Sequence, residues 1–121
     1  MSAAAWIAVA LLGGAMAVAR FAVDAVLSDH PIQPFPLGIL VVNLAGTLVV
    51  GVAAGAALGG EARTIVAGGV TGSFTTFSTW MLDTERLADV GRVRLAWLNL
   101  GLSLLAGFAA VALGHWLGGA L

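Results

Sequence analysis

Hydroxyl and aromatic side chains crowd into one short stretch of this chain, between Gly72 and Trp80. The stretch reads Gly-Ser-Phe-Thr-Thr-Phe-Ser-Thr-Trp and lies inside a longer apolar segment, residues 64–82, that contains no charged residue. In an apolar medium a hydroxyl without a hydrogen-bond partner costs roughly 2–7 kcal/mol. The five hydroxyls between Ser73 and Thr79 therefore indicate that something polar is met along this stretch.

The same side chains suit a small anion. Hydroxyls and the amide of Asn43 donate hydrogen bonds, and an aromatic ring can turn its positive edge toward negative charge. No carboxylate lies at mid-depth to oppose an anion. Gly72 and Ser73 also favour a local break in the helix, which would free backbone carbonyls to coordinate a cation. The alternative is that the hydroxyls bond back to the i−4 carbonyls and only bend the helix.

The composition is typical of a membrane protein. Of the 121 residues, 60% are hydrophobic and 9% are charged, and the mean hydropathy is +1.05, whereas a soluble domain carries about 25% charged residues. The net charge is −1 and lysine is absent, so no basic field would attract nucleic acid. Cysteine is absent too, which excludes disulfides and thiolate metal sites.

Clusters of charge divide the chain into four long charge-free stretches, and a spanning helix needs about 20 mainly apolar residues. All three prolines lie in a loop over residues 30–36. We therefore predict an all-α membrane protein with one domain, residues 1–121, whose third helix is broken near its middle. The four transmembrane helices are expected at residues 3–27, 37–58, 63–88 and 93–117.

Small residues recur every four positions on three of these helices, which lets helix backbones approach closely in lipid. The rows are Asn43, Thr47, Gly51 and Gly55; Gly68 and Gly72; and Asn99, Ser103 and Gly107. For the glycines we favour packing as the interpretation. Asn43 is different, because an amide near the middle of a spanning helix needs a partner or a wet cavity. For Asn43, a functional role and simple interhelical bonding stay equally open.

These residues resemble the Fluc/CrcB family of fluoride channels. The third helix of that family carries a pattern close to G-x-x-T-T-F-S-T-F, which the stretch from Gly72 to Trp80 follows. Shorter matches lie in the other helices: Gly13-Gly14 and Arg20-Phe21, Pro36-Leu37-Gly38 with Val42-Asn43 and Gly46, and Ser103 with Leu113-Gly114. The resemblance covers nearly the whole chain, and the third-helix motif is its specific part.

The resemblance implies an antiparallel dual-topology dimer with two narrow pores, which export fluoride passively across the bacterial plasma membrane. The residues implied to line the pores are Asn43, Phe77, Ser78, Thr79, Trp80 and Ser103. Main-chain oxygens of Gly72 and Thr75 are implied to hold a structural sodium ion. Arg20 is implied to lie near a vestibule, although an interfacial arginine reaching toward lipid headgroups is an equally good interpretation. The expected partners are fluoride, sodium, membrane lipids and a second subunit.

Four positions depart from the family's pattern. Trp80 replaces the second phenylalanine of the pore pair, although it still offers an aromatic edge and an N–H donor. Ile39 occupies a position that is often threonine and offers nothing to an anion. Ala17 replaces a first-helix glycine, and Asn99 stands where tyrosine is frequent. We therefore expect one of the two pores, or part of each, to be degraded.

The arginines are distributed unevenly between the two ends of the expected bundle. Arg63 lies on the side of the termini, whereas Arg20, Arg86, Arg92 and Arg94 lie on the other side. The positive-inside rule would place the termini outside. A dual-topology homodimer needs a chain with little bias. A heterodimer with a homologous, oppositely oriented chain is therefore a second hypothesis beside the homodimer.

Two other classes of protein stay open. A small multidrug exporter also has four short helices, but it needs a proton-coupled carboxylate deep in the membrane, and Asp24 lies late in the first helix. A non-conducting partner subunit would use the hydroxyls to hold helices together. An enzyme is not expected, because His30 and His115 are too far apart to form a local metal motif and no catalytic motif is present.

Overall fold

The computed structural model describes residues 1–28 and 35–121, and these ranges are helical with short connections. The helices follow in the order α1 (Ala3–Ser28), α2 (Leu37–Gly55), α3 (Gly60–Thr64), the π-helix η1 (Ile65–Thr71), α4 (Gly72–Phe74), α5 (Ser78–Asp89) and α6 (Val93–Gly119). Most of the predicted loop over residues 30–36, including His30, lies outside the described residues.

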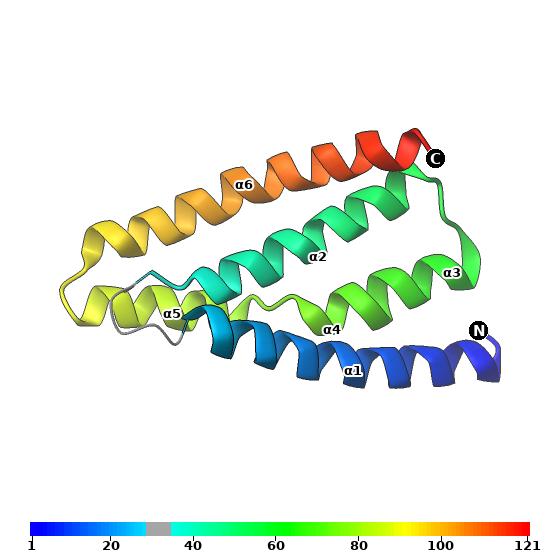
Figure 1. The fold of residues 1–121 in the computed structure, drawn as a ribbon, viewed down its shortest axis with the longest axis horizontal. Coiled ribbons are helices and arrows are strands. Elements are labelled where there is room, and N and C mark those ends of the chain that lie inside the picture. The colour runs from blue at the N-terminus through cyan, green and yellow to red at the C-terminus, as the bar shows by residue number, and fades with distance from the viewer. Residues whose placement is uncertain (29–34) are drawn as a thin grey trace.

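Three helices are long and apolar enough to cross a membrane, namely Ala3–Leu27, Leu37–Gly55 and Val93–Gly119. They correspond to the first, second and fourth predicted crossings. The third predicted crossing is built from α3, η1, α4 and α5, which follow one another in line with an interruption after α4 (Figure 1). The chain is therefore a multi-pass membrane protein with a broken third helix, as its sequence predicts.

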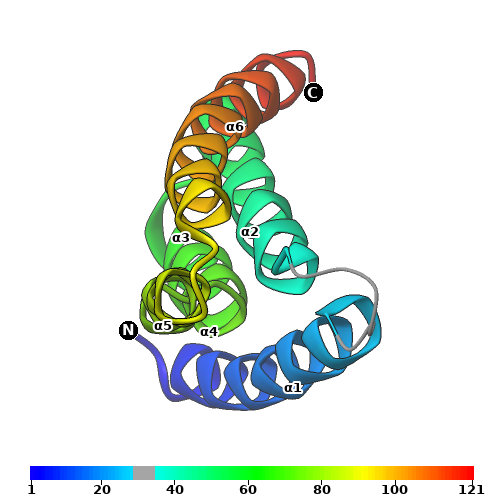
Figure 2. The same cartoon turned by 90° about the vertical axis from the view of Figure 1, so that its left-hand side faces the viewer.

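The broken helix lies in the middle of the bundle. Figure 2 shows α4 and α5 between α1 on one side and the pair formed by α2 and α6 on the other. η1 and α4 contact α1, and α5 contacts α6. The termini and α3 lie at one end of the bundle, while the end of α1 and the turn between α5 and α6 lie at the other (Figure 1). The hydroxyl-rich stretch is thus next to the three other crossings.

Glycines set the close packing of α2 on α6, the most extensive helix pair in the fold. A Cβ added at Gly51 or Gly55 would fall against main-chain atoms of α6, and one added at Gly114 or Gly118 would fall against main-chain atoms of α2. A Gly-x-x-x-Gly pair on each helix therefore lets the two backbones touch. The packing role predicted for Gly51 and Gly55 is confirmed, while the matching pair on α6 was not predicted.

Other glycines in the predicted rows do not pack closely. A Cβ at Gly68 of η1, or at Gly107 of α6, would have no atom within 4 Å in the described part of the chain, apart from its own local backbone. Gly69 instead approaches α1, because a Cβ there would lie 3.2 Å from the Cα of Val9. The close contact of the third crossing with α1 is therefore made one residue away from the predicted row.

The break in the third helix falls later than its glycine suggests. Gly72 is helical, with φ −62° and ψ −31°. Thr75 has extended backbone, with φ −79° and ψ 156°, and α5 begins only at Ser78. Glycine permits a break but does not impose one. The group that fixes the break is a side chain of α2, so its position depends on tertiary structure.

Candidate functional site

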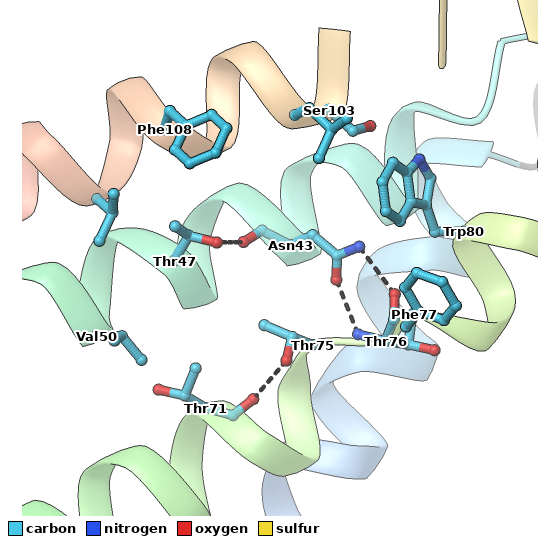
Figure 3. A pocket seen from close by; sticks show the side chains of 13 residues that line it. Asn43, Thr47, Val50, Thr71, Thr75, Thr76, Phe77, Trp80, Ser103 and Phe108 are labelled. Carbon is cyan, nitrogen blue, oxygen red and sulfur yellow. Dashed lines mark hydrogen bonds between the residues drawn. The ribbon is translucent and has the colours of Figure 1, made fainter. Parts of the chain in front are cut away.

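The Asn43 side chain, on α2, holds the break in the third helix. Its Oδ1 accepts the Thr76 N–H at 2.8 Å, and its Nδ2 donates to the Thr76 carbonyl at 2.9 Å (Figure 3). Irregular backbone at membrane depth is tolerated only where its polar groups find partners. A single amide satisfies both main-chain groups of Thr76. The interhelical bonding that we considered for Asn43 is therefore present.

The bond to Asn43 also changes the turn before the break. In an unbroken helix the Thr76 N–H would be donated to the carbonyl four residues earlier, that of Gly72. Here that N–H is donated to Asn43, which releases the Gly72 carbonyl from its helical partner. Thr75, with its extended backbone, turns its carbonyl away from the helical direction. Carbonyls freed in broken helices are the groups that coordinate sodium in many membrane proteins.

The Thr76 hydroxyl organises the start of α5. Its Oγ1 accepts the Thr79 N–H at 3.2 Å and so caps the first turn of that helix. The same hydroxyl donates to Thr79 Oγ1 at 3.2 Å and lies 3.4 Å from Ser78 Oγ. Two of the predicted pore hydroxyls, those of Ser78 and Thr79, are therefore gathered around Thr76. Ser78 is exposed there and Thr79 is half-buried.

Other hydroxyls bond back within their own helix, as the alternative interpretation predicts. Thr75 Oγ1 donates to the Thr71 carbonyl at 3.0 Å, and Thr47 Oγ1 donates to the Asn43 carbonyl at 2.6 Å. Bonds of this kind satisfy the hydroxyl locally and tend to bend the helix. Several hydroxyls near the break are thus bonded to the backbone of their own helix.

A groove of about 460 Å³ opens beside the break (Figure 3). It is lined by Asn43, Thr47, Val50, Thr71, Thr75, Thr76, Phe77, Trp80, Ser103, Leu104, Gly107, Phe108 and Val111, none of which is charged. Four of the six predicted pore residues meet there, namely Asn43, Phe77, Trp80 and Ser103. The predicted site residues that do not line it are Gly72, Ser78, Thr79 and Arg20, the last half-buried on α1.

Two aromatic rings form one end of this groove. The centroids of the Phe77 and Trp80 rings are 5.7 Å apart and their planes meet at 82°, an edge-to-face arrangement. Such a pair contributes about 0.5–1.5 kcal/mol beyond the burial of its surface. The Phe77 side chain is 69% exposed, so its ring is accessible to a solute or to a second chain.

The indole of Trp80 is not a free hydrogen-bond donor. Its Nε1 donates to the main-chain carbonyl of Asn99, on α6, at 3.3 Å. The expectation that Trp80 offers an N–H to an anion is therefore wrong, because this N–H already has an acceptor. What Trp80 presents to the groove is its ring. Ile39, the other departure near the predicted track, is 2% exposed and belongs to the apolar core.

Thr71, which the sequence analysis did not single out, has a different environment from its neighbours. The residue is 7% exposed, and its Oγ1 is the buried side-chain atom without a hydrogen-bond partner in the described part of the chain. Thr71 ends η1, where the π-helical backbone bonds residue i to residue i+5. The wider turn displaces the i−4 carbonyl to which a threonine ordinarily bonds. No local sequence pattern distinguishes Thr71 from Thr75.

A family model described as "CrcB-like protein, Camphor Resistance (CrcB)" matches residues 7–115 of the chain. The chain belongs to the CrcB family. The resemblance inferred from the third-helix motif is thus confirmed, and the break and the groove both lie within the matched residues. Among the relatives of this CrcB chain, "Fluoride-specific ion channel FluC 2" of Mycolicibacterium paratuberculosis is 44% identical over 114 residues, 94% of this chain and 93% of the relative.

Two further relatives of this CrcB protein cover it almost completely. "Fluoride-specific ion channel FluC 2" of Mycobacterium tuberculosis is 40% identical over 117 residues, 97% of this chain and 93% of the relative. "Fluoride-specific ion channel FluC 1" of Symbiobacterium thermophilum is 38% identical over 119 residues, 90% of this chain and 96% of the relative. The similarity therefore extends over all four predicted crossings.

Proposed function

We propose that this chain is a subunit of a fluoride-selective ion channel that lets cytoplasmic fluoride leave the cell passively through the bacterial plasma membrane. The observation that carries the proposal is the meeting of Asn43, Phe77, Trp80 and Ser103 in one uncharged groove, in a chain whose relatives are named fluoride-specific channels. The names of the relatives identify fluoride as the proposed ion. The groove supplies a path for it along the broken helix.

The chemistry of the groove suits a small, strongly hydrated anion. An amide nitrogen carries two N–H groups, and Asn43 uses one of them on the Thr76 carbonyl, which leaves the other for a solute. The hydroxyl of Ser103 and the ring edge of Phe77 add weak positive contacts. A fixed cation would hold the anion too tightly, because conduction requires release. An uncharged lining therefore favours passage over storage.

The predicted residues outside the groove extend the same path. Ser78 and Thr79 lie at the start of α5, directly after Phe77, and we assign them to a polar track beyond the groove. Arg20 lies on α1 and is half-buried. Its guanidinium would raise the local concentration of anions at a vestibule without binding them at mid-depth.

A structural sodium ion forms part of the proposal. The carbonyl of Gly72 is released by the bond between Asn43 and Thr76, and Thr75 next to the break is extended. Neutral main-chain oxygens at a helix break fit sodium. Two carbonyls fill only part of a cation's coordination shell, which supports a second subunit that supplies the rest.

The second subunit is proposed to pack antiparallel to the first, in a homodimer or a heterodimer. Arg86, Arg92 and Arg94 lie around the turn between α5 and α6, at the same end as the end of α1, whereas Arg63 lies on α3 at the other end (Figure 1). This bias supports one preferred orientation and so a homologous partner of opposite orientation. Symbiobacterium thermophilum has relatives named FluC 1 and FluC 2, which is consistent with paired subunits.

Ion efflux from proteoliposomes tests the proposed function. The purified chain is reconstituted into liposomes loaded with potassium fluoride or potassium chloride, valinomycin is added, and an ion electrode follows the released anion. We expect rapid fluoride efflux and little chloride efflux. Equal efflux of both anions would overturn the selective channel. If the folded chain gives no efflux, the non-conducting partner subunit is favoured. Adding a homologous chain should then restore fluoride efflux.

A further inference from the structure

Three hydrogen bonds join Trp80, Thr84 and Asn99 into a closed ring, here called the Trp80 clasp. The Trp80 Nε1 donates to the Asn99 carbonyl at 3.3 Å. The Asn99 Nδ2 donates to Thr84 Oγ1 at 2.9 Å, and Thr84 Oγ1 donates to the Trp80 carbonyl at 2.8 Å. Each residue gives one bond and accepts one, so the ring fixes α5 against α6.

The surroundings of the clasp make it more than a surface contact. Asn99 is 1% exposed and is, with Val42, one of the two largest fully buried side chains in the described part of the chain. An amide buried to that degree needs a partner, because an unpaired one would cost about 1–3 kcal/mol. Thr84 supplies that partner. The clasp is therefore fixed from its buried side, at Asn99, while Trp80 is half-buried.

The clasp determines which part of Trp80 faces the groove. In Figure 3 the indole nitrogen points away from Asn43, and the six-membered ring lies on the groove side. Its edge-to-face contact with Phe77 has a centroid distance of 5.7 Å. With its N–H held by a carbonyl, the tryptophan presents a carbon edge, as the phenylalanine common at this position in the family would.

We propose that Thr84 and Asn99 are positioning residues that make Trp80 act as a phenylalanine-like edge in the anion path. This inference rests on the proposed channel function. An indole N–H is a strong donor compared with a C–H edge, and a donor aimed into the path would hold a small anion and slow its release. The clasp masks that donor and fixes the ring against Phe77.

Thr84→Val tests the clasp because it removes the hydroxyl that both donates and accepts while keeping the shape of the side chain. We expect fluoride efflux from proteoliposomes to fall roughly three- to twentyfold, the factor that corresponds to losing one interhelical hydrogen bond in a membrane. Thr84→Ser keeps the hydroxyl and should restore most of the efflux. Thr64→Val is the matched control, since the Thr64 hydroxyl bonds to the Gly60 carbonyl at the exposed end of the bundle.

A double-mutant cycle separates positioning from folding. Trp80→Phe has no indole N–H, and its fluoride efflux is the reference for the second half of the cycle. In that background Thr84→Val should cause no further loss, because there is no donor left to mask. A loss as large as in the wild-type background would show that Thr84 acts on assembly of the helices and would overturn the proposal.

Tryptophan fluorescence gives a readout that does not depend on conduction. The other three tryptophans, Trp6, Trp97 and Trp116, are each more than 60% exposed, so replacing them with phenylalanine leaves Trp80 as the single emitter. Thr84→Val should shift its emission, and Thr84→Ser should not. An unchanged emission would overturn the clasp as the group that positions the ring. A wild-type chain without fluoride efflux would instead overturn the proposed function, whatever the emission shows.

Discussion

The third crossing contains two irregular stretches, and they treat their polar groups in opposite ways. In the break, which runs from Thr75 to Phe77, the main-chain groups of Thr76 are paired with Asn43 and its hydroxyl caps α5. In the π-helix η1, which ends about one turn earlier, the hydroxyl of Thr71 is buried and has no partner in the described residues. One stretch is fixed by a neighbouring helix, while the other leaves a donor unpaired.

This difference shows what a cluster of hydroxyls in a membrane helix indicates about structure. The count of hydroxyls between Ser73 and Thr79 suggests a lining of donors, but several of them hold the backbone or one another. The groups that remain for a solute come from different helices: one N–H of Asn43, the hydroxyl of Ser103 and the edge of Phe77. The cluster of hydroxyls in the sequence therefore indicates where the helix breaks. The groups that could meet a solute are those that other helices place opposite the break.

Asn43→Leu should have the largest effect, because it removes both partners of the break at once. Two main-chain groups of Thr76 would be left unpaired, each at about 1–3 kcal/mol, so we expect the chain to lose about 2–6 kcal/mol of stability. We also expect it to lose nearly all fluoride efflux. Unfolding by a titration with sodium dodecyl sulfate measures the first, and proteoliposome efflux the second. Thr64→Val is the control, because the Thr64 hydroxyl bonds to the Gly60 carbonyl and does not line the groove. Lost efflux with unchanged stability would show that Asn43 acts only on the anion.

Gly46→Ala should have the next effect, because a Cβ at Gly46 would fall on the Cγ2 atom of Thr75. Thr75 cannot simply rotate, since it is β-branched and its hydroxyl bonds to the Thr71 carbonyl. We expect overpacking to cost about 1–2 kcal/mol and to shift the break. Gly68→Ala is the matched change in η1, where a Cβ meets open space. Equal losses at the two positions would contradict the difference between the stretches.

Thr76→Val removes the cap of α5 and leaves the main-chain bonds to Asn43 in place. A lost threonine cap costs about 1–2 kcal/mol, so the unfolding midpoint in detergent should fall less than for Asn43→Leu. Thr76→Ser keeps the hydroxyl and should unfold near the wild-type midpoint. If both variants were equally destabilised, the methyl group of Thr76 and not its hydroxyl would hold the start of α5.

Much of the fold is predictable because each crossing is encoded locally. Charge-free stretches of sufficient length predict four helical segments, and the helix bounds differ from those expected by only a few residues. Three of these segments are long and apolar enough to cross a membrane. The packing role of Gly51 and Gly55 also follows from their spacing, although the spacing does not identify α6 as the partner. The partner pair Gly114 and Gly118 was missed because the row considered on that helix, from Asn99 to Gly107, lies nearer its start.

The site is less predictable because its key bonds join distant parts of the chain. Asn43 and Thr76 are 33 positions apart, and no local pattern shows that one amide will hold this backbone. Gly72 therefore drew attention as the point of the break, although Thr75 is the residue that departs from the helix. The masked N–H of Trp80 depends likewise on Thr84 and Asn99, which share no motif.

Thr71→Val should have the smallest effect, and its sign should be opposite to that of Thr76→Val. A buried hydroxyl without a partner destabilises the folded chain, so replacing it with a methyl group of the same shape removes that cost. We expect a gain of about 0.5–1 kcal/mol in the free energy of unfolding, measured by the same detergent titration.

The two valine variants together decide whether the comparison between the stretches holds. A hydroxyl that is already paired must lose something when it is removed, whereas an unpaired one has nothing to lose. If Thr71→Val destabilised the chain as much as Thr76→Val, the Thr71 hydroxyl would have a partner in the membrane, namely water, an ion or the proposed second subunit. Measuring fluoride efflux for Thr71→Val then separates an ion from the other two sources, because only a hydroxyl that meets the permeating ion should change the rate of efflux.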